Sequence, residues 1–338
     1  MFRLIARDIA IDLGTANTLV YVKGAGIVLN EPSIVALRQK GNRPEPIAFG
    51  MEAKGMLGRT PGYLEVIRPI RTGVIADFQV AGMMLKNFLS KVRQKSVSLL
   101  KPRHVVIGVP SGITEVEKRA IRDTVMAEAH EIKLIDEAMA AAVGCDLPVT
   151  EACASMIVDI GGGTTDVAVI SLSDIVYSVS LRYGGDSMDE AIINHMRRRH
   201  HLLIGEATAE LIKITIGSAH RAFDEQEMEV RGRSLVSGAP AAINIKSEEI
   251  REAISEVVGQ IVDAVRSAME QTPPELSGDI LARGVALAGG GALIKGLDRL
   301  ISEHLRVAVV VADDPLAAVV AGAGKCLDNP GLYRSILT

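Results

Sequence analysis

The feature that most constrains this chain is a motif that occurs twice in register. The first copy reads DLGTANTLVYV at residues 12–22, and the second reads DIGGGTTDVAV at residues 159–169. In each copy an apolar run ends at an aspartate, small and glycine residues follow, and β-forming residues resume, which predicts two strands joined by a tight hairpin. The match continues downstream, where residues 26–29 align with residues 174–177. A repeat this long indicates two similar half-molecules, each opening with a three-stranded meander.

Both copies carry residues suited to phosphate and metal. Glycines let the backbone approach a ligand closely, and successive N–H groups of a turn form a concavity that fits phosphate oxygens. A carboxylate beside phosphates is repelled unless a cation lies between them, so Asp12 and Asp159 are most simply partners of hydrated Mg²⁺. One nucleotide with its metal, bound between the halves, would use both hairpins. The plainer alternative is a pair of tight turns in a β-rich core.

Length and composition fit this duplication. A chain of 338 residues is long enough for two domains, and 48% hydrophobic with 23% charged residues is typical of a compact α/β protein. With 37 basic and 41 acidic side chains the net charge is −4, so we expect no nucleic-acid partner. The basic run RRRHH at residues 197–201 is better explained as the solvated end of a helix.

The histidines and cysteines predict no metal or disulfide framework. His195 and His200 are five residues apart, which does not place them on one helical face. The 3 cysteines form no CxxC motif, which fits a reducing, cytoplasmic location.

No apolar stretch is long enough to span a bilayer, and no ordinary signal peptide opens the chain. Two short segments are both apolar and basic: MFRLIAR at residues 1–7 and SVSLLK at residues 96–101. We expect them to hold the protein peripherally on an anionic membrane surface. A frayed terminus and a small buried contact are the alternatives.

In the first half, a Gly- and Pro-rich stretch at residues 30–68 predicts an inserted lobe, and Thr114 with Glu117 forms a capping-box signature that opens a helix. Asp136 and Glu137 open another helix, which is rich in small residues. Capping explains both acids. Glu137, at a strand end, could also orient a water for attack on a terminal phosphate.

In the second half, residues 223–247 predict the hairpins of another inserted lobe, followed by a long amphipathic helix at about 248–270. Glu210 and Lys213 are one helical turn apart, and a surface ion pair is the simplest explanation. The strand at residues 285–288 ends in three glycines that could receive a base or ribose. The sequence GAGK at residues 322–325 resembles a P-loop fragment, but it lacks the preceding glycine and the following hydroxyl residue.

Residues 12–18, 159–165 and 288–291 resemble the two phosphate loops and the adenosine loop of the actin, Hsp70 and sugar-kinase superfamily. Within it, the chain is similar over nearly its whole length to the MreB family of bacterial actins, the rod shape-determining proteins. The segments that carry this likeness are LNEPS at 29–33, GRTPG at 58–62, GVIAD at 73–77, PSG at 110–112, IGE at 204–206 and TPPEL at 272–276.

The resemblance implies an α/β fold of the actin-like, duplicated ribonuclease H-like type. It has two domains, each with a smaller inserted subdomain, and a nucleotide cleft between them. The implied boundaries are 1–32, 66–145 and 316–338 for subdomain IA, 33–65 for IB, 146–181 and 246–315 for IIA, and 182–245 for IIB.

The resemblance also implies ATP or ADP with Mg²⁺ as ligands. It assigns Glu137 and Thr164 to placing the hydrolytic water, and Asp12 and Asp159 to holding Mg²⁺ through water. The implied nucleotide contacts are Gly14, Thr15, Ala16, Asn17, Gly161, Gly162, Gly163, Thr164, Glu210, Leu211, Ile212, Lys213, Gly290, Gly291, Ala292 and Leu293. Three places depart from the family pattern: Ala138 replaces a proline, Ala288 replaces a threonine, and residues 306–308 lack the common glycine-proline pair. We expect nucleotide binding to remain intact and a looser Glu137 to hydrolyse more slowly.

The implied function is a slow ATPase coupled to filament assembly, in a cytoskeletal protein that maintains rod cell shape by organising cell-wall synthesis. The implied partners are further copies of the chain in antiparallel double filaments, the inner face of the cytoplasmic membrane, and the cell-wall elongation machinery such as RodZ and MreC. The alternatives on the same fold are a small-molecule kinase, which needs a pocket acid to activate an acceptor hydroxyl, and a chaperone-type ATPase.

Overall fold

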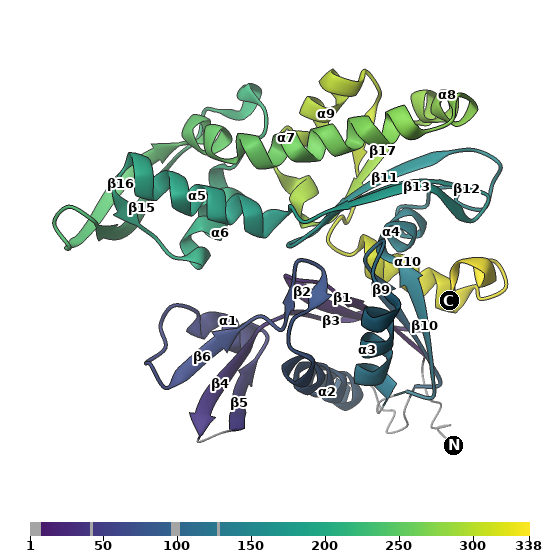
Figure 1. Cartoon of the computed structure of the whole chain (residues 1–338), viewed down its shortest axis with the longest axis horizontal. Coiled ribbons are helices and arrows are strands. Elements are labelled where there is room, and N and C mark those ends of the chain that lie inside the picture. The colour runs from purple at the N-terminus through teal and green to yellow at the C-terminus, as the bar shows by residue number, and fades with distance from the viewer. Residues whose placement is uncertain (1–7, 41–42, 96–101, 127–128) are drawn as a thin grey trace.

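The computed structural model describes residues 8–40, 43–95, 102–126 and 129–338. The chain forms two lobes, one above the other in Figure 1, and each lobe is built on a five-stranded sheet. The first sheet has the order β10-β9-β1-β2-β3. Its strands are β1 (Ile9–Leu13), β2 (Asn17–Val22), β3 (Gly26–Pro32), β9 (His104–Val109) and β10 (Glu131–Asp136).

The second sheet repeats this topology with the order β13-β12-β11-β17-β18. Its strands are β11 (Ser155–Ile160), β12 (Thr165–Ser171), β13 (Asp174–Leu181), β17 (Val285–Ala288) and β18 (Val309–Val311). In each sheet the meander is antiparallel and its first strand runs parallel to the next strand along the sheet. Asp12 and Asp159 stand at the same position of β1 and β11. The duplication predicted from the sequence is therefore confirmed.

Each main lobe carries a smaller one, on the left of Figure 1. The first consists of the sheet β5-β4-β6 and one short helix: β4 (Val35–Lys40), β5 (Arg43–Phe49), β6 (Leu64–Ile67) and α1 (Met51–Met56). The second consists of the sheet β14-β15-β16 and two helices: β14 (Leu202–Leu203), β15 (Glu227–Ser234), β16 (Pro240–Lys246), α5 (Gly185–Arg199) and α6 (Glu206–Ile216).

The remaining helices cover the two main sheets: α2 (Phe78–Lys95), α3 (Glu115–Met126), α4 (Glu137–Gly144), α7 (Ser247–Gln271), α8 (Pro274–Arg283), α9 (Leu297–Leu305) and α10 (Ala318–Asp328). Short elements complete the chain: the hairpin β7 (Ile70–Arg71) and β8 (Val74–Ile75), and the 3-10 helices η1 (Arg221–Phe223), η2 (Gly290–Leu293) and η3 (Arg334–Ile336).

The predicted capping box is present at the start of α3. The backbone N–H of Glu117 donates to Oγ1 of Thr114 at 3.2 Å, and the backbone N–H of Thr114 donates to the Glu117 carboxylate at 2.7 Å. In the described part of the chain, no helix combines the length and the apolar character that a bilayer crossing requires. The predicted membrane segments at residues 1–7 and 96–101 lie outside the described residues.

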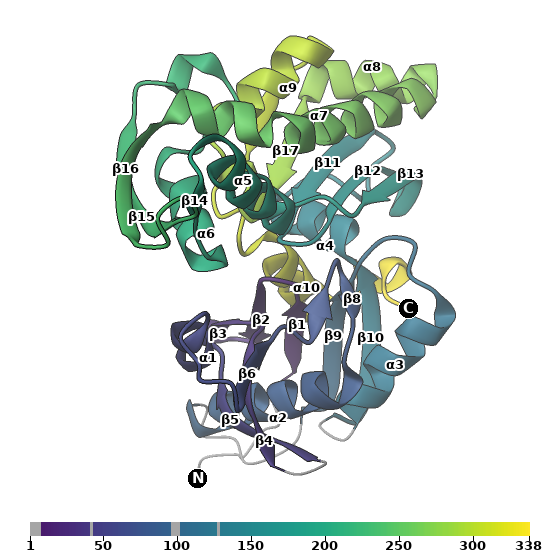
Figure 2. The ribbon, with the colours of Figure 1, turned by 60° about the vertical axis from the view of Figure 1, so that its left-hand side comes forward.

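The junction between the lobes contains a tightly packed pair of small-residue helices, α4 and α10 (Figure 2). Gly144 lies directly against the carbonyl of Ala318, and Gly322 lies against the carbonyl of Ala140, so a Cβ at either glycine would overlap backbone. This position explains the P-loop-like GAGK segment, because Gly322 serves helix packing inside α10. The small residues of α4 are what allow this close packing.

Candidate functional site

The twin hairpins open into one cavity between the lobes. Its volume is about 460 Å³, within the range of small-molecule sites. The predicted residues that line it are Asp12, Gly14, Thr15, Ala16, Asn17, Glu137, Asp159, Gly161, Gly162, Gly163, Thr164, Glu210, Lys213, Gly290, Gly291 and Leu293. The structure therefore brings together most of the site expected from the sequence.

Three predicted contacts do not line this cavity. Along α6, Glu210, Lys213 and Ile214 face the cavity, because residues three and four apart share a helix face. Ile212 points the other way and is fully buried, and Leu211 is 52% exposed. Ala292 is buried in the core of the second lobe. A side-chain contact from these three residues to a ligand in the cavity has no support in this geometry.

The two hairpins touch, and their glycines are what allow the contact. A Cβ at Gly162 would lie 2.8 Å from that of Ala16, and a Cβ at Gly163 would lie 2.7 Å from Oγ1 of Thr15. That hydroxyl oxygen also accepts the backbone N–H of Gly73, from the β7–β8 turn, at 3.0 Å. Both backbone concavities consequently face the same space, as two halves of one phosphate site would.

Three of the predicted carboxylates, Asp12, Glu137 and Asp159, line the cavity, and Asp166 is buried close behind them. Burial raises the pKa of Asp12 to about 7 and that of Asp166 to about 6. Burial, followed by repulsion from neighbouring carboxylates, raises the pKa of Asp159 and Glu137 well above their usual range. Oδ1 of Asp166 is buried and has no hydrogen-bond partner among the described residues. Such a cluster is stabilised by a cation, and oxygen ligands suit Mg²⁺.

The adjacent acids at the start of α4 have different roles. Asp136 is the N-cap: its Oδ1 accepts the N–H groups of Ala138 at 3.0 Å and Met139 at 3.3 Å, and Ser111 donates to its Oδ2 at 2.7 Å. Glu137 takes no part in this cap and lines the cavity. A proline at position 138 would lack the donated N–H, so Ala138 supports the cap while leaving Glu137 available for chemistry.

The expected ion pair between Glu210 and Lys213 is wrong, because each side chain has another partner. Glu210 pairs with Lys54 of α1 at 2.8 Å, across the cavity between the two smaller lobes. Lys213 donates to Asp189 at 2.8 Å and to the carbonyl of Gly185 at 2.9 Å. No local sequence pattern predicts the contact between Lys54 and Glu210, since the two residues are far apart along the chain.

Arg68 makes a second link across the cavity. Its guanidinium lies 3.6 Å from Asp186 of α5 and 3.4 Å from Glu206 of α6. Arg68, Lys54 and Lys213 add positive charge to a cavity whose floor is acidic. Such a distribution suits a ligand that brings both phosphate oxygens and a divalent cation.

Comparison with known proteins identifies the family to which this chain belongs. The sequence model of the MreB/Mbl protein family matches residues 6–334. The cell shape-determining protein MreB of Escherichia coli K12 is 55% identical over 328 residues, covering 96% of this chain and 94% of that protein. The crystal structure of MreB5 of Spiroplasma citri bound to ADP superposes with a TM-score of 0.91 at 37% identity, covering 98% of both chains. Its AMPPNP-bound form also gives 0.91, at 38% identity and with 96% of this chain and 97% of that one covered. On this evidence and on its actin-like fold, the chain belongs to the MreB/Mbl family.

Proposed function

We propose that this chain is an ATP-dependent, polymerising cytoskeletal protein that maintains rod cell shape by organising cell-wall synthesis. One observation carries the proposal: two duplicated hairpins, each with its own aspartate, meet at a single cavity between two lobes. A nucleotide bound there contacts both lobes at once. Whether it is a triphosphate or a diphosphate can therefore bias the relative orientation of the lobes and hence the association of copies of the chain.

In this proposal the loops at residues 14–17 and 161–164 hold the phosphates, and Gly290, Gly291 and Leu293 lie beside the nucleoside. Asp12 and Asp159 hold Mg²⁺ through water, and the ion neutralises phosphate charge. Glu137 and Thr164, which both line the cavity, orient the water that attacks the terminal phosphate. A carboxylate whose pKa is raised by burial is a stronger base than usual, which suits this role.

The proposal extends to assembly and location. Copies of the chain associate into antiparallel double filaments on the inner face of the cytoplasmic membrane, linked to the cell-wall elongation machinery such as RodZ and MreC. The four-subdomain division proposed for the sequence is supported by two main sheets and two smaller inserted sheets.

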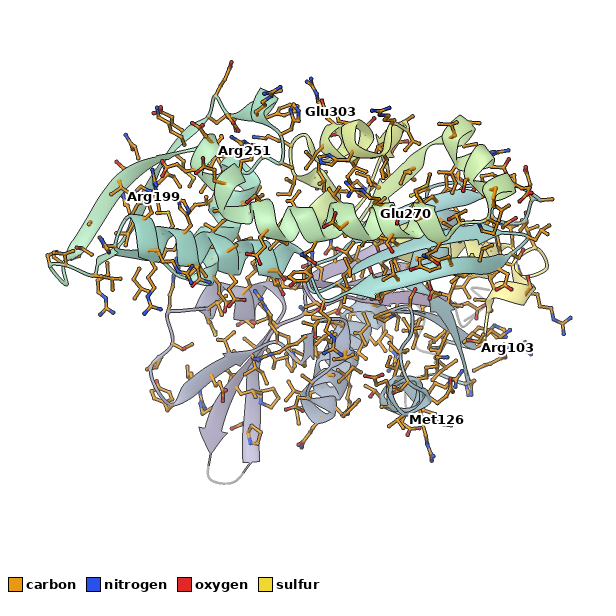
Figure 3. The ribbon with its side chains drawn as sticks, turned by 45° about the horizontal axis from the view of Figure 1, so that its top comes forward. Arg103, Met126, Arg199, Arg251, Glu270 and Glu303 are labelled. Atoms are coloured by element: carbon orange, nitrogen blue, oxygen red, sulfur yellow. The ribbon has the colours of Figure 1, made fainter. Side chains whose placement is uncertain are left out.

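Sedimentation and electron microscopy with and without Mg–ATP test assembly, together with phosphate release. Glu137→Gln should keep nucleotide affinity and lower phosphate release by roughly 100- to 10,000-fold, the usual contribution of a general base. Glu270→Gln, on the exposed end of α7 (Figure 3), is the matched control and should release phosphate normally. Unchanged turnover in Glu137→Gln would remove the role assigned to this residue. Phosphate transfer to a small acceptor, with no polymer, would favour the kinase alternative.

Membrane association is tested by liposome flotation. Deleting residues 2–7 together with Leu99→Ser and Leu100→Ser should abolish flotation with anionic vesicles, because the apolar and basic groups of both segments are removed. Leu172→Ser, which changes a leucine that is 66% exposed on the described surface, should float normally. Undiminished flotation of the combined variant would exclude these segments.

A further inference from the structure

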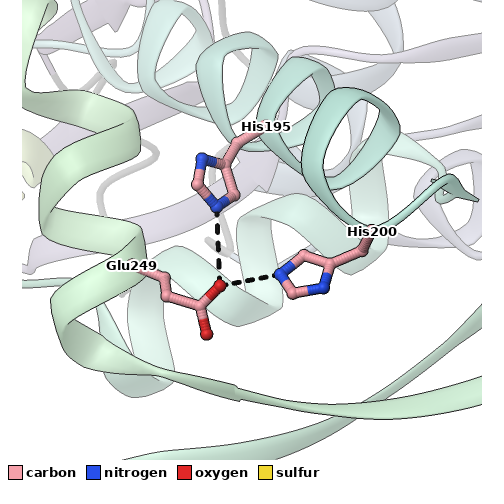
Figure 4. A group of neighbouring side chains, drawn as sticks. All are labelled: His195, His200 and Glu249. Carbon is pink, nitrogen blue, oxygen red and sulfur yellow. Dashed lines mark hydrogen bonds and ion pairs between the residues drawn. The ribbon is translucent and has the colours of Figure 1, made fainter.

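Two imidazoles and one carboxylate meet where the end of α5 packs against the start of α7 (Figure 4). His195 comes from the last turns of α5, His200 directly follows that helix, and Glu249 lies in the first turn of α7. Nε2 of His200 is 2.7 Å from Oε2 of Glu249, and Nε2 of His195 is 3.7 Å from the same oxygen. All three ligand atoms lie within 4.8 Å of one another.

This grouping corrects the expectation from spacing alone. Residues five positions apart lie on different faces of an α-helix. However, α5 ends at Arg199, and His200 follows as its C-cap residue. The ring of His200 therefore turns back toward His195 across the helix end, and their centroids are 5.9 Å apart.

The distances suit a small metal ion. Zinc bonds of roughly 2.0–2.2 Å in tetrahedral geometry place neighbouring ligand atoms about 3.3 Å apart. The observed separations of 2.7 Å and 3.7 Å lie on either side of that value. Small side-chain shifts would bring both imidazole nitrogens and the carboxylate oxygen onto one ion.

Of the proposed ligand atoms, one lacks a hydrogen bond and another is held by one. Nε2 of His195 is buried and accepts or donates no hydrogen bond within the described residues, which is costly for a polar atom. Oε2 of Glu249 is held by its hydrogen bond with Nε2 of His200 at 2.7 Å.

One neighbouring charge competes with a cation here. Nε of Arg199 lies 3.8 Å from the same oxygen of Glu249. The Arg199 side chain is 66% exposed and lies at the outer surface near the end of α5 (Figure 3), so it can turn into solvent when an ion binds. Its removal should therefore strengthen metal binding.

We propose that His195, His200 and Glu249 bind one divalent transition-metal ion, of which Zn²⁺ is the best match to two imidazoles and one carboxylate. Water takes the fourth position. The ion joins the helix of the smaller lobe, α5, to the long helix of the main lobe, α7. Because the other end of α5 carries Asp186 and Asp189 at the nucleotide cavity, the metal fixes a helix that reaches both sites.

Zinc affinity of the nucleotide-free full chain, measured by competition with a chromophoric chelator, tests this proposal. We expect one equivalent per chain and tetrahedral visible bands when Co²⁺ replaces Zn²⁺. His195→Phe, which keeps an aromatic ring at this position, and Glu249→Gln should each weaken binding by more than about 100-fold, since loss of an outer partner alone costs roughly 10- to 100-fold. Arg199→Ala should bind zinc more tightly than the parent chain.

His201→Ala is the control, because His201 is an exposed neighbour outside the cluster. It should bind zinc like the parent chain, and Mg–ADP binding by each variant verifies that it is folded. The proposal is overturned if the parent chain binds no zinc at micromolar concentrations. It is equally overturned if folded His195→Phe and Glu249→Gln retain full affinity, or if His201→Ala loses as much as they do.

Discussion

Replacing Asp12 by asparagine should stabilise the nucleotide-free protein while weakening its response to Mg–nucleotide. Burial raises the pKa of Asp12 from 3.8 to about 7. At 1.36 kcal/mol per pH unit, that rise corresponds to a cost on the order of 4 kcal/mol for holding the ionised form. Asparagine keeps the size of the side chain and cannot ionise.

The sign of this effect sets its pH dependence. Because the folded-state pKa is raised, the folded protein holds its proton more tightly than the unfolded chain, so ionisation costs stability as the pH rises from about 4 to about 7. The gain in Asp12→Asn should be full at pH 8 and absent at pH 4. A substitution that merely improved packing would act equally at both values.

Thermal unfolding at these two pH values, with and without Mg–ADP, measures both effects. Asp12→Asn should unfold several degrees higher than the parent chain at pH 8 without ligand, and should gain less from Mg–ADP. Asp123→Asn, on the exposed face of α3, is the matched control and should change neither. A lower unfolding temperature at pH 8, or an undiminished response to Mg–ADP, would refute the electrostatic account of this cluster.

Two further changes test the packing of α4 against α10 and the contacts across the cavity. Gly322→Ala should cost about 1–3 kcal/mol in denaturant unfolding, because its Cβ overlaps the carbonyl of Ala140, whereas Gly259→Ala in α7 has open space and should stabilise by about 0.4–1 kcal/mol. Equal effects would contradict the packing argument. Lys54→Glu and Glu210→Lys should each destabilise the nucleotide-free chain slightly and restore each other when combined, with a coupling of about 0.2–1 kcal/mol for this partly exposed pair. Strictly additive changes would show that the contact stabilises nothing.

The local parts of the site could be predicted from the sequence. The aspartate hairpins were visible because strand alternation and glycines are local signals, and their repetition indicated two halves. The capping box at Thr114 was visible for the same reason. The sequence alone does not show which of Asp136 and Glu137 caps the helix and which lines the cavity, because that depends on which side chain turns toward the helix N–H groups.

Contacts between distant segments were missed. Lys54 forms an ion pair with Glu210 only because the two inserted lobes face each other, and no local sequence pattern predicts that arrangement. The family resemblance implies contacts along the continuous segment from Glu210 to Lys213, but the helical period turns Leu211 and Ile212 away from the cavity. The position of His200 cannot be predicted from spacing alone, because it depends on where α5 ends.

In the proposed function both hairpins hold one Mg-bound nucleotide. Calorimetric titration with Mg–ADP of the parent chain, Asp12→Asn and Asp159→Asn measures whether they do. We predict one nucleotide per chain, with each substitution alone weakening that same site. Two independent sites, or full affinity after either substitution, would contradict the account.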